Sequence, residues 1–175
     1  CRIFLASLCA RFGKTIWSAA IAQEVGADLV VIASYVKTVI TSFAGDLTSF
    51  QQFAEYEHID TGAEGYQEAI SAALADGKKV VAYLSMANGS KRQERIDFLS
   101  EAGSNRFLII DEADFGVHRE GQAQSLVDIQ DRFGYILIMT GTNADRAVAN
   151  WKIDHIVSVT YPELIMQKKA TKRAA

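Results

Sequence analysis

A repeated alternation of helical patterns, single glycines and short apolar runs limits what this chain can fold into. Four glycines are each followed, within a few residues, by a run rich in Val, Ile, Leu or Phe: Gly26 before 29–33, Gly77 before 80–84, Gly103 before 107–110, and Gly134 before 135–139. A glycine readily takes the left-handed conformation that ends a helix, and apolar runs without polar alternation are expected of strands covered on both faces. The pattern therefore predicts a mostly parallel sheet.

The segments between these runs and the two ends of the chain complete the expected architecture. Residues at helical spacing indicate one-sided helices within the segments 66–74, 96–102 and 123–130. Further strands are expected at 2–8 and 155–160, with a weaker candidate at 56–60. Because no Pro-rich or Ser-rich linker interrupts this order, we expect one domain over 1–175, with a three-layer, doubly wound α/β fold.

Composition narrows the class of protein. With 175 residues, 49% of them apolar, the chain suits a single domain with a continuous core. Its 18 basic and 21 acidic residues give a net charge of -3, so any contact with nucleic acid has to be local. Cys1 and Cys9 make neither a disulfide framework nor a metal site, and no apolar run is long enough to cross a bilayer. These features predict a cytoplasmic protein with no membrane partner.

The tripeptide Gly13-Lys14-Thr15 follows the first expected strand and opens a helix expected over 14–25. A strand that leads into a helix start directs backbone N–H groups and the positive end of the helix dipole at an anion. Lys14 adds a mobile charge for the β and γ phosphates of ATP, and the Thr15 hydroxyl is suited to bind Mg²⁺. We therefore expect a phosphate loop that binds ATP with Mg²⁺.

The residues before this tripeptide depart from the full phosphate-loop motif. Leu8 stands where the motif has its first glycine, and Arg11 and Phe12 replace small residues. The expected loop nevertheless contains Ala10, Arg11 and Phe12 as phosphate-binding residues. Arg11 has two interpretations, a phosphate contact or a surface ion pair. The missing glycine also motivates an alternative in which the domain binds nucleotide only as a scaffold.

An acidic box, Asp111-Glu112-Ala113-Asp114, directly follows the apolar run at 107–110. Ligands bind at the carboxyl ends of strands in open α/β sheets, and carboxylates at this place form a Walker B arrangement. Asp111 is predicted to hold Mg²⁺, and Glu112 to act as the general base for the water that attacks the γ-phosphate. The alternative is that these residues only cap the next helix. Asp114 is either a relay toward a later motif or a local cap.

With these two motifs in this order, the chain resembles the first RecA-like, DEAD-box-type domain of superfamily-two helicases and DNA translocases over nearly its full length. The resemblance implies a P-loop NTPase fold and a coupling motif at a later strand end, which Thr140-Gly141-Thr142 fits. The Thr-Gly-Thr form is more similar to the DNA translocases of restriction enzymes, chromatin remodellers and phages than to the Ser-Ala-Thr of RNA helicases. DNA is therefore favoured over RNA. The alternative is a hydroxyl-rich strand end that turns into a helix.

The same resemblance implies nucleic-acid contacts after two other strands. The positions that match are Ser34, Tyr35 and Lys37 after the second strand, and Ser85 and Met86 after the run at 80–84. Solvated loop residues are the alternative. The family's motors also close a second RecA-like domain on ATP, and that domain supplies an arginine finger. Such a second domain is expected as a partner from the same protein, and no second half of this kind is present in these residues.

The function expected from these motifs is that of an ATP-hydrolysing motor domain, which couples ATP hydrolysis to movement on nucleic acid. Full activity is expected only with the second domain. Two alternatives remain open. One is another P-loop ATPase, of the partition or signalling type, and the other is the scaffold module without turnover.

Overall fold

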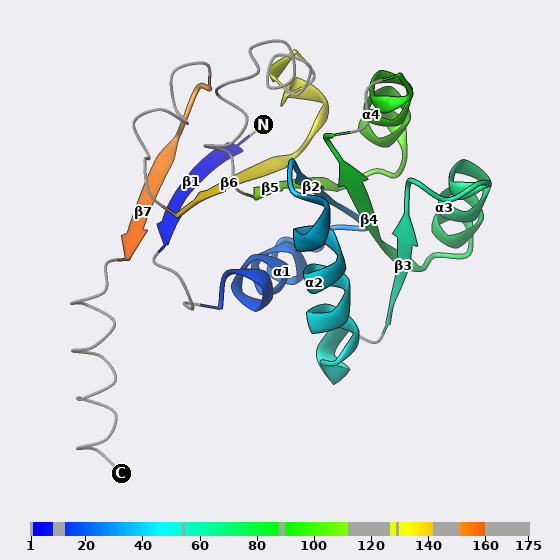
Figure 1. Cartoon of the computed structure of the whole chain (residues 1–175), viewed down its shortest axis with the longest axis horizontal. Coiled ribbons are helices and arrows are strands. Elements are labelled where there is room, and N and C mark those ends of the chain that lie inside the picture. Colours follow the sequence, from blue (N-terminus) through cyan, green and yellow to red (C-terminus); the bar gives the residue numbers. More distant parts are fainter. Residues whose placement is uncertain are drawn as a thin grey trace.

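Seven strands form a single parallel sheet in the computed structural model of the chain, which describes residues 2–8, 13–53, 55–87, 90–111, 127–128, 130–141 and 151–159. The strands are β1 (Arg2–Leu8), β2 (Leu29–Ser34), β3 (Tyr56–Asp60), β4 (Lys79–Ser85), β5 (Arg106–Asp111), β6 (Tyr135–Thr140) and β7 (His155–Val159). Their order across the sheet is β3-β4-β2-β5-β6-β1-β7, and all pairings are parallel (Figure 1). The predicted sheet is confirmed, and it is wholly parallel in the described residues.

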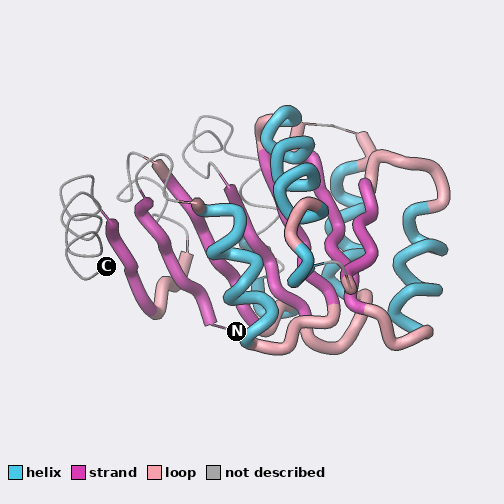
Figure 2. The backbone as a smooth tube through the Cα atoms, turned by 90° about the horizontal axis from the view of Figure 1, so that it is seen from below, coloured by secondary structure: helices cyan, strands magenta, loops and turns pink. Residues whose placement is uncertain are grey.

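Helices cover both faces of this sheet, as the three-layer prediction requires. They are α1 (Lys14–Glu24), α2 (Lys37–Thr48), α3 (Tyr66–Ala75) and α4 (Arg92–Glu101), with short 3-10 helices η1 (Gln51–Phe53) and η2 (Gln130–Arg132). The apolar residues of α1 and α2 join one core layer, and those of α3 and α4 join the other. Figure 2 shows helices on both sides of the row of strands. None of the helices in the described ranges is long and apolar enough to cross a membrane.

The interior strand β2 explains why the apolar runs lack polar alternation. All of its residues are buried. Val31 and Ala33 face the core layer under α3 and α4, whereas Val30 and Ile32 face the layer under α1 and α2. Because full burial of one such side chain contributes about 1.5–3 kcal/mol, a polar residue on either face of this strand would be costly.

Most of the predicted elements agree with the structure, and the differences are local. The weaker candidate at 56–60 is confirmed as the edge strand β3, whereas the long helix α2 was not among the predicted elements. The helix expected over 123–130 falls largely outside the described residues. One detail is wrong: Gly134 does not take the left-handed conformation that Gly26, Gly77 and Gly103 take.

Gly134 has a different role, which the backbone around it explains. Its N–H donates to the Arg106 carbonyl at 3.0 Å, and its own carbonyl accepts from the Arg2 N–H at 3.0 Å. A β-carbon at this position would lie 3.3 Å from the Asn105 side-chain oxygen. Gly134 is therefore suited to a close approach between the starts of β1, β5 and β6, and a helix cap is not needed there.

A hydrogen-bonded junction fixes the amino ends of β2 and β5. The Asp28 carboxylate accepts from the backbone N–H groups of Ser104 at 2.9 Å and Asn105 at 3.0 Å. The Asn105 amide in turn donates to the carbonyls of Val25 at 2.8 Å and Gly26 at 3.0 Å. Backbone groups at the end of α1 thereby gain hydrogen-bond partners. The same bonds fix the register of β2 and β5 at their amino ends.

Candidate functional site

The carboxyl ends of the parallel strands bring the predicted motifs to one edge of the sheet. The pairings there place Ser7 of β1 beside Thr140 of β6 and Ser34 of β2 beside Asp111 of β5. Strand β6 lies between β1, which precedes the predicted phosphate loop, and β5, which ends at the predicted acidic box. The end of β6 is therefore flanked by both predicted nucleotide motifs.

Gly13, the described part of the predicted phosphate loop, leads into a helix whose start has no side-chain cap. Gly13 is the residue before α1, with φ 90° and ψ 37°, and its carbonyl accepts the first helical hydrogen bond from the Trp17 N–H at 3.1 Å. Lys14 and Thr15 follow and are half-buried. The first N–H groups of a helix have no partner within the helix, so this end is suited to an anion. Ala10, Arg11 and Phe12 lie outside the described residues.

Lys14 and Gly141 approach each other at this edge. A β-carbon placed on Gly141, directly after β6, would lie 3.9 Å from Lys14 Nζ. The ammonium group therefore lies over the end of β6. The structure thus brings together two residues that the motifs placed far apart in the chain.

The other predicted nucleotide residues are partly described. Asp111 is the last residue of β5 and is only 4% exposed. Thr140 is the last residue of β6 and is fully buried, and its hydroxyl has no hydrogen-bond partner among the described residues. Buried polar groups nearly always have a hydrogen-bond partner. The Thr140 hydroxyl is therefore a candidate to gain one when a ligand binds or the domain changes conformation. Glu112, Asp114 and Thr142 lie outside the described residues.

The residues at this edge have the donor chemistry that Mg²⁺ prefers. Mg²⁺ is commonly held by one or two carboxylates together with phosphate oxygens and water. The Asp111 carboxylate and the Thr15 hydroxyl supply hard oxygen donors, at the end of β5 and the start of α1. The described residues include no group of three or more His, Cys, Asp or Glu that would make an all-protein metal site. The donor set therefore fits a magnesium ion that shares its ligands with a nucleotide.

The predicted nucleic-acid residues after β2 are largely engaged with the fold. The Ser34 side chain is fully buried, and its hydroxyl accepts from the Val36 N–H at 3.1 Å and donates to the Val36 carbonyl at 3.3 Å. Tyr35 is half-buried, and burial raises the pKa of its hydroxyl while the positive charge of Arg92 partly offsets this. Lys37 begins α2. Tyr35 is thus the better placed of the two described side chains for an outside contact.

The two predicted residues at the end of β4, Ser85 in the strand and Met86 after it, are less accessible than the sequence suggested. The hydroxyl of Ser85 is buried and has no hydrogen-bond partner within the described part of the chain. Met86 is fully buried in the core, and its N–H donates to the Ser34 carbonyl at 2.9 Å. A contact between nucleic acid and Met86 would therefore have to use its backbone, and Met86 links the ends of β2 and β4.

The fold is shared with helicase domains of known structure. The crystal structure of the Pyrococcus furiosus Hef helicase domain matches 94% of this chain and 36% of its own, with a TM-score of 0.64 and 19% identity. The chain has the fold of a helicase RecA-like domain. A hypothetical ATP-dependent RNA helicase from Sulfolobus tokodaii matches over 90% of this chain and 48% of its own, with a TM-score of 0.59 and 15% identity.

These likenesses concern the arrangement of the backbone. The chain spans less than half the length of either of these two helicase structures. No protein-family model matches the sequence, and a comparison with curated proteins found no match either. A shared fold does not establish a shared function. The function has to be inferred from the residues at the carboxyl ends of the strands.

Proposed function

We propose that this RecA-like domain binds and hydrolyses ATP as the first motor domain of a superfamily-two DNA helicase or translocase. The observation that carries the proposal is the approach of Lys14 to Gly141, with the β-carbon position of Gly141 3.9 Å from Lys14 Nζ. The buried Asp111 carboxylate ends β5 on the other side of β6. A cation and a helix start thus lie at the end of β6, and a carboxylate ends the neighbouring strand β5; nucleotide phosphates and their metal require such groups.

In this proposal each residue acts on a defined part of ATP. Lys14 and the first N–H groups of α1 bind the β and γ phosphates. Asp111 and Thr15 hold Mg²⁺, which when bound neutralises charge on the phosphate oxygens. Glu112 accepts a proton from the attacking water while the new bond from oxygen to the γ-phosphorus forms and the bond to the β-γ bridging oxygen breaks. The negative charge of that bridging oxygen remains on ADP.

Thr140, Gly141 and Thr142 are proposed to connect this reaction to movement on nucleic acid, together with Asp114. Support comes from the position of Thr140, a buried hydroxyl at the end of the strand that lies between β1 and β5. The Thr-Gly-Thr form favours duplex DNA as the track. Tyr35 and the loops after β2 and β4 are the proposed contact region. A second RecA-like domain of the same protein is proposed to complete the ATP site.

Nucleotide binding and turnover by the chain test the central proposal. We expect weak binding of Mg-ATP and slow hydrolysis, with no unwinding. Lys14→Ala should abolish nucleotide binding, whereas Glu112→Gln should keep binding and lose turnover. Lys78→Ala is the matched control, because Lys78 pairs with Glu57 on the surface of the sheet edge at β3 and β4. Equal hydrolysis by wild type and Glu112→Gln would show that Glu112 is not the base.

The effect of nucleic acid on ATP hydrolysis distinguishes DNA from RNA as the substrate, and it also tests the two alternative functions. A protein that also contains the second RecA-like domain should hydrolyse ATP faster with duplex DNA than with RNA. Turnover that no nucleic acid stimulates would favour a partition-type or signalling-type ATPase. Binding without turnover in the same protein would favour the scaffold module. Unwinding by the 175 residues alone would contradict the proposed division of labour between two domains.

A further inference from the structure

Ser34 and Asp111 end neighbouring strands at the same level of the sheet. They are register partners of β2 and β5, and neighbouring strands lie about 4.8 Å apart. Both side chains lie on the face that α1 and α2 cover, because Ile32 and Ile109, two residues before each of them, belong to that core layer. A serine hydroxyl and the carboxylate proposed to hold Mg²⁺ are therefore adjacent on one face.

The strand on the other side of β5 offers no comparable group. The register of β5 and β6 pairs Ile110 with Ile138, so the next residue of β6, beside Asp111, is Met139, which is fully buried. A thioether has no proton to donate. Among the described strand residues beside Asp111, Ser34 is therefore the one whose side chain can donate a hydrogen bond.

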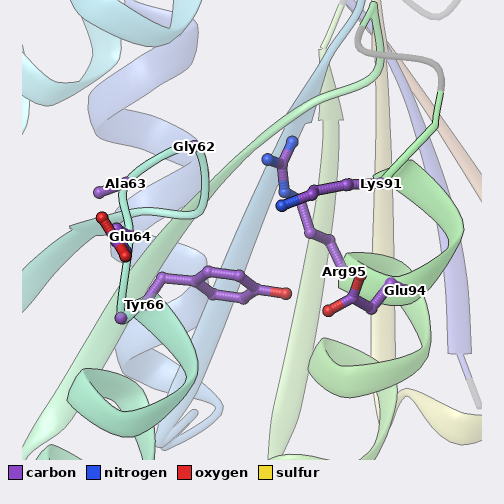
Figure 3. A pocket seen from close by; sticks show the side chains of 8 residues that line it. Gly62, Ala63, Glu64, Tyr66, Lys91, Glu94 and Arg95 are labelled. Atoms are coloured by element: carbon purple, nitrogen blue, oxygen red, sulfur yellow. The ribbon is translucent and has the colours of Figure 1, made fainter.

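The cations at the start of α4 belong to another part of the fold. The apolar residues of α4 pack in the layer under α3 and α4. Figure 3 shows the side chains of Lys91 and Arg95 extending toward the loop that carries Gly62, which follows β3. Strands β4 and β2 separate β3 from β5. Neither cation is placed to orient the Asp111 carboxylate.

The oxygen of the Ser34 hydroxyl is held in place, whereas its proton is held only weakly. The oxygen accepts from the Val36 N–H at 3.1 Å, and the proton is donated to the Val36 carbonyl at 3.3 Å. Strong O–H···O bonds are about 2.5–3.0 Å long, so this donated bond is a poor one. Rotation about the bond between carbon and oxygen can redirect the proton while the bond from the Val36 N–H remains.

The Asp111 carboxylate is the better acceptor for this proton. An ionised carboxylate accepts stronger and shorter hydrogen bonds than a neutral oxygen does. It offers about four lone-pair sites, so it can accept from Ser34 in addition to its other contacts. Ser34 is fully buried and Asp111 is 4% exposed, and such surroundings strengthen a hydrogen bond. The competing neighbour, the buried hydroxyl of Ser85 on β4, is neutral.

We propose that Ser34 is a positioning residue for the metal site, because its hydroxyl donates to the Asp111 carboxylate and holds it in the orientation that binds Mg²⁺. This role rests on the proposed function, in which Asp111 is a magnesium ligand. Carboxylates that bind metals are commonly held by a hydrogen bond of this kind. The full burial of Ser34, which does not suit a contact with nucleic acid, suits this internal role.

Calorimetric titration of the chain with ADP at a series of Mg²⁺ concentrations tests the role of Ser34 without turnover. In Ser34→Ala, the Mg²⁺ concentration that gives half of the metal-dependent gain in ADP affinity should rise about tenfold, as is common when a metal ligand loses its hydrogen-bond partner. ADP affinity without Mg²⁺ should stay unchanged. Ser100→Ala is the control, because Ser100 is also buried and its hydroxyl donates to the Asp97 carbonyl at 2.8 Å.

Ser34→Thr and Ser34→Val form a second pair, similar in shape, of which only the first keeps a hydroxyl. Ser34→Thr should require less Mg²⁺ than Ser34→Val does. The same requirement in both variants would overturn the proposal, and this comparison decides the matter if Ser34→Ala fails to fold. A fall in metal-free ADP affinity as large as the change in the Mg²⁺ requirement would also overturn it, since the hydroxyl would then support the fold.

Asp111→Asn separates a failure of this proposal from a failure of the proposed function. If Asp111→Asn loses the metal-dependent gain while Ser34→Ala behaves as the wild type does, Ser34 does not position Asp111, and the magnesium role of Asp111 stands. If Asp111→Asn keeps the wild-type gain, Asp111 is not a magnesium ligand, and both proposals are overturned. Loss of the gain in Asp111→Asn with a raised Mg²⁺ requirement in Ser34→Ala supports both.

Discussion

Lys14 Nζ lies 3.9 Å from the point that a β-carbon on Gly141 would occupy. Lys14 begins α1 and Gly141 directly follows β6, so this approach joins the start of α1 to the strand end that carries Thr140. The absence of a side chain at 141 leaves the lysine ammonium room above the strand. A change at Gly141 should therefore act through Lys14.

Substitution of Gly141 should weaken nucleotide binding in proportion to side-chain size. A single methyl group in Gly141→Ala would be in ordinary van der Waals contact with Lys14, and the residue does not have a positive φ, so a small effect is expected. The branched side chain of Gly141→Val would displace the ammonium, and we expect ATP affinity to fall by about tenfold, or about 1.4 kcal/mol. Calorimetric titration with Mg-ATP measures this.

Gly45→Ala is the control for this series, because Gly45 lies in α2 with open space around its β-carbon position. It should leave ATP affinity unchanged and slightly stabilise the helix. Wild-type affinity in Gly141→Val would show that the approach of Lys14 to the end of β6 has no part in nucleotide binding.

Thr140→Val should separate coupling from stability. The Thr140 hydroxyl is buried without a hydrogen-bond partner in the described residues, so its replacement by a methyl group should leave the free energy of unfolding unchanged or raise it. Stimulation of ATP hydrolysis by nucleic acid should nevertheless fall in the two-domain protein. Thermal unfolding and stimulated turnover are measured on the same samples.

Thr61→Val provides the matched comparison for Thr140→Val. Thr61 is also buried, but its hydroxyl donates to the Tyr83 carbonyl at 2.8 Å. Its loss should cost about 1 kcal/mol of stability. If Thr140→Val destabilises the chain as much as Thr61→Val does, the Thr140 hydroxyl has a structural partner and the coupling role loses its support.

The fold was predictable because its signals are local. A strand such as β2, buried on both faces, needs a continuous apolar run, and Gly26, Gly77 and Gly103 end the preceding segments with a positive φ. Helix α2 was missed because none of the punctuating glycines follows it. Gly134 was misinterpreted because its requirement is a close backbone approach, and no pattern in the sequence distinguishes that from a helix cap.

The sequence indicated the motifs of the candidate site, but it did not indicate which of their residues are neighbours. The order of the strands decides which strand ends meet, and it places β6 between β1 and β5. The contact between Lys14 and Gly141 and the pairing of Ser34 with Asp111 depend on that order. The burial of Arg95 on α4 was not indicated by any motif, since charged residues on a short helix are expected to be solvated. Burial of Arg95 is visible only when α4 packs.

Asp28→Ala should destabilise the amino end of the sheet without affecting the candidate nucleotide site at the carboxyl end. The carboxylate accepts from two backbone N–H groups, and its loss leaves both to find other partners. We expect a loss of about 1–3 kcal/mol in the free energy of unfolding, measured by urea denaturation, with ATP affinity unchanged. Glu24→Ala, an exposed residue at the end of α1, should change neither quantity. A large loss of ATP affinity in Asp28→Ala would mean that the two edges of the sheet are coupled.

His58 on the edge strand β3 should make stability depend on pH. Its Nδ1 lies 2.8 Å from the Tyr83 hydroxyl, and its Nε2 is buried with no partner among the described residues. Burial lowers the pKa of His58 from its ordinary 6.5, and the nearby backbone of Phe53 and the charge of Glu57 only partly oppose this. The neutral ring is therefore favoured in the folded state.

The sign of the effect follows from that direction. Well above pH 6.5 His58 is neutral in both the folded and the unfolded chain, and its full contribution to stability is present. As the pH falls below this value the unfolded chain binds a proton first, so stability decreases until the pH passes the lower pKa of the folded state. Glu57 does not titrate in this pH range, because the hydrogen bond from Lys78 lowers its pKa below the ordinary 4.5.

Urea denaturation at about pH 7.5 and about pH 5.5 measures this effect against a His58→Gln variant, whose side chain does not titrate. The wild type should lose more stability between the two values than the variant does, because only the wild type exchanges a proton at this position. The same loss in both proteins would assign the pH dependence to other groups.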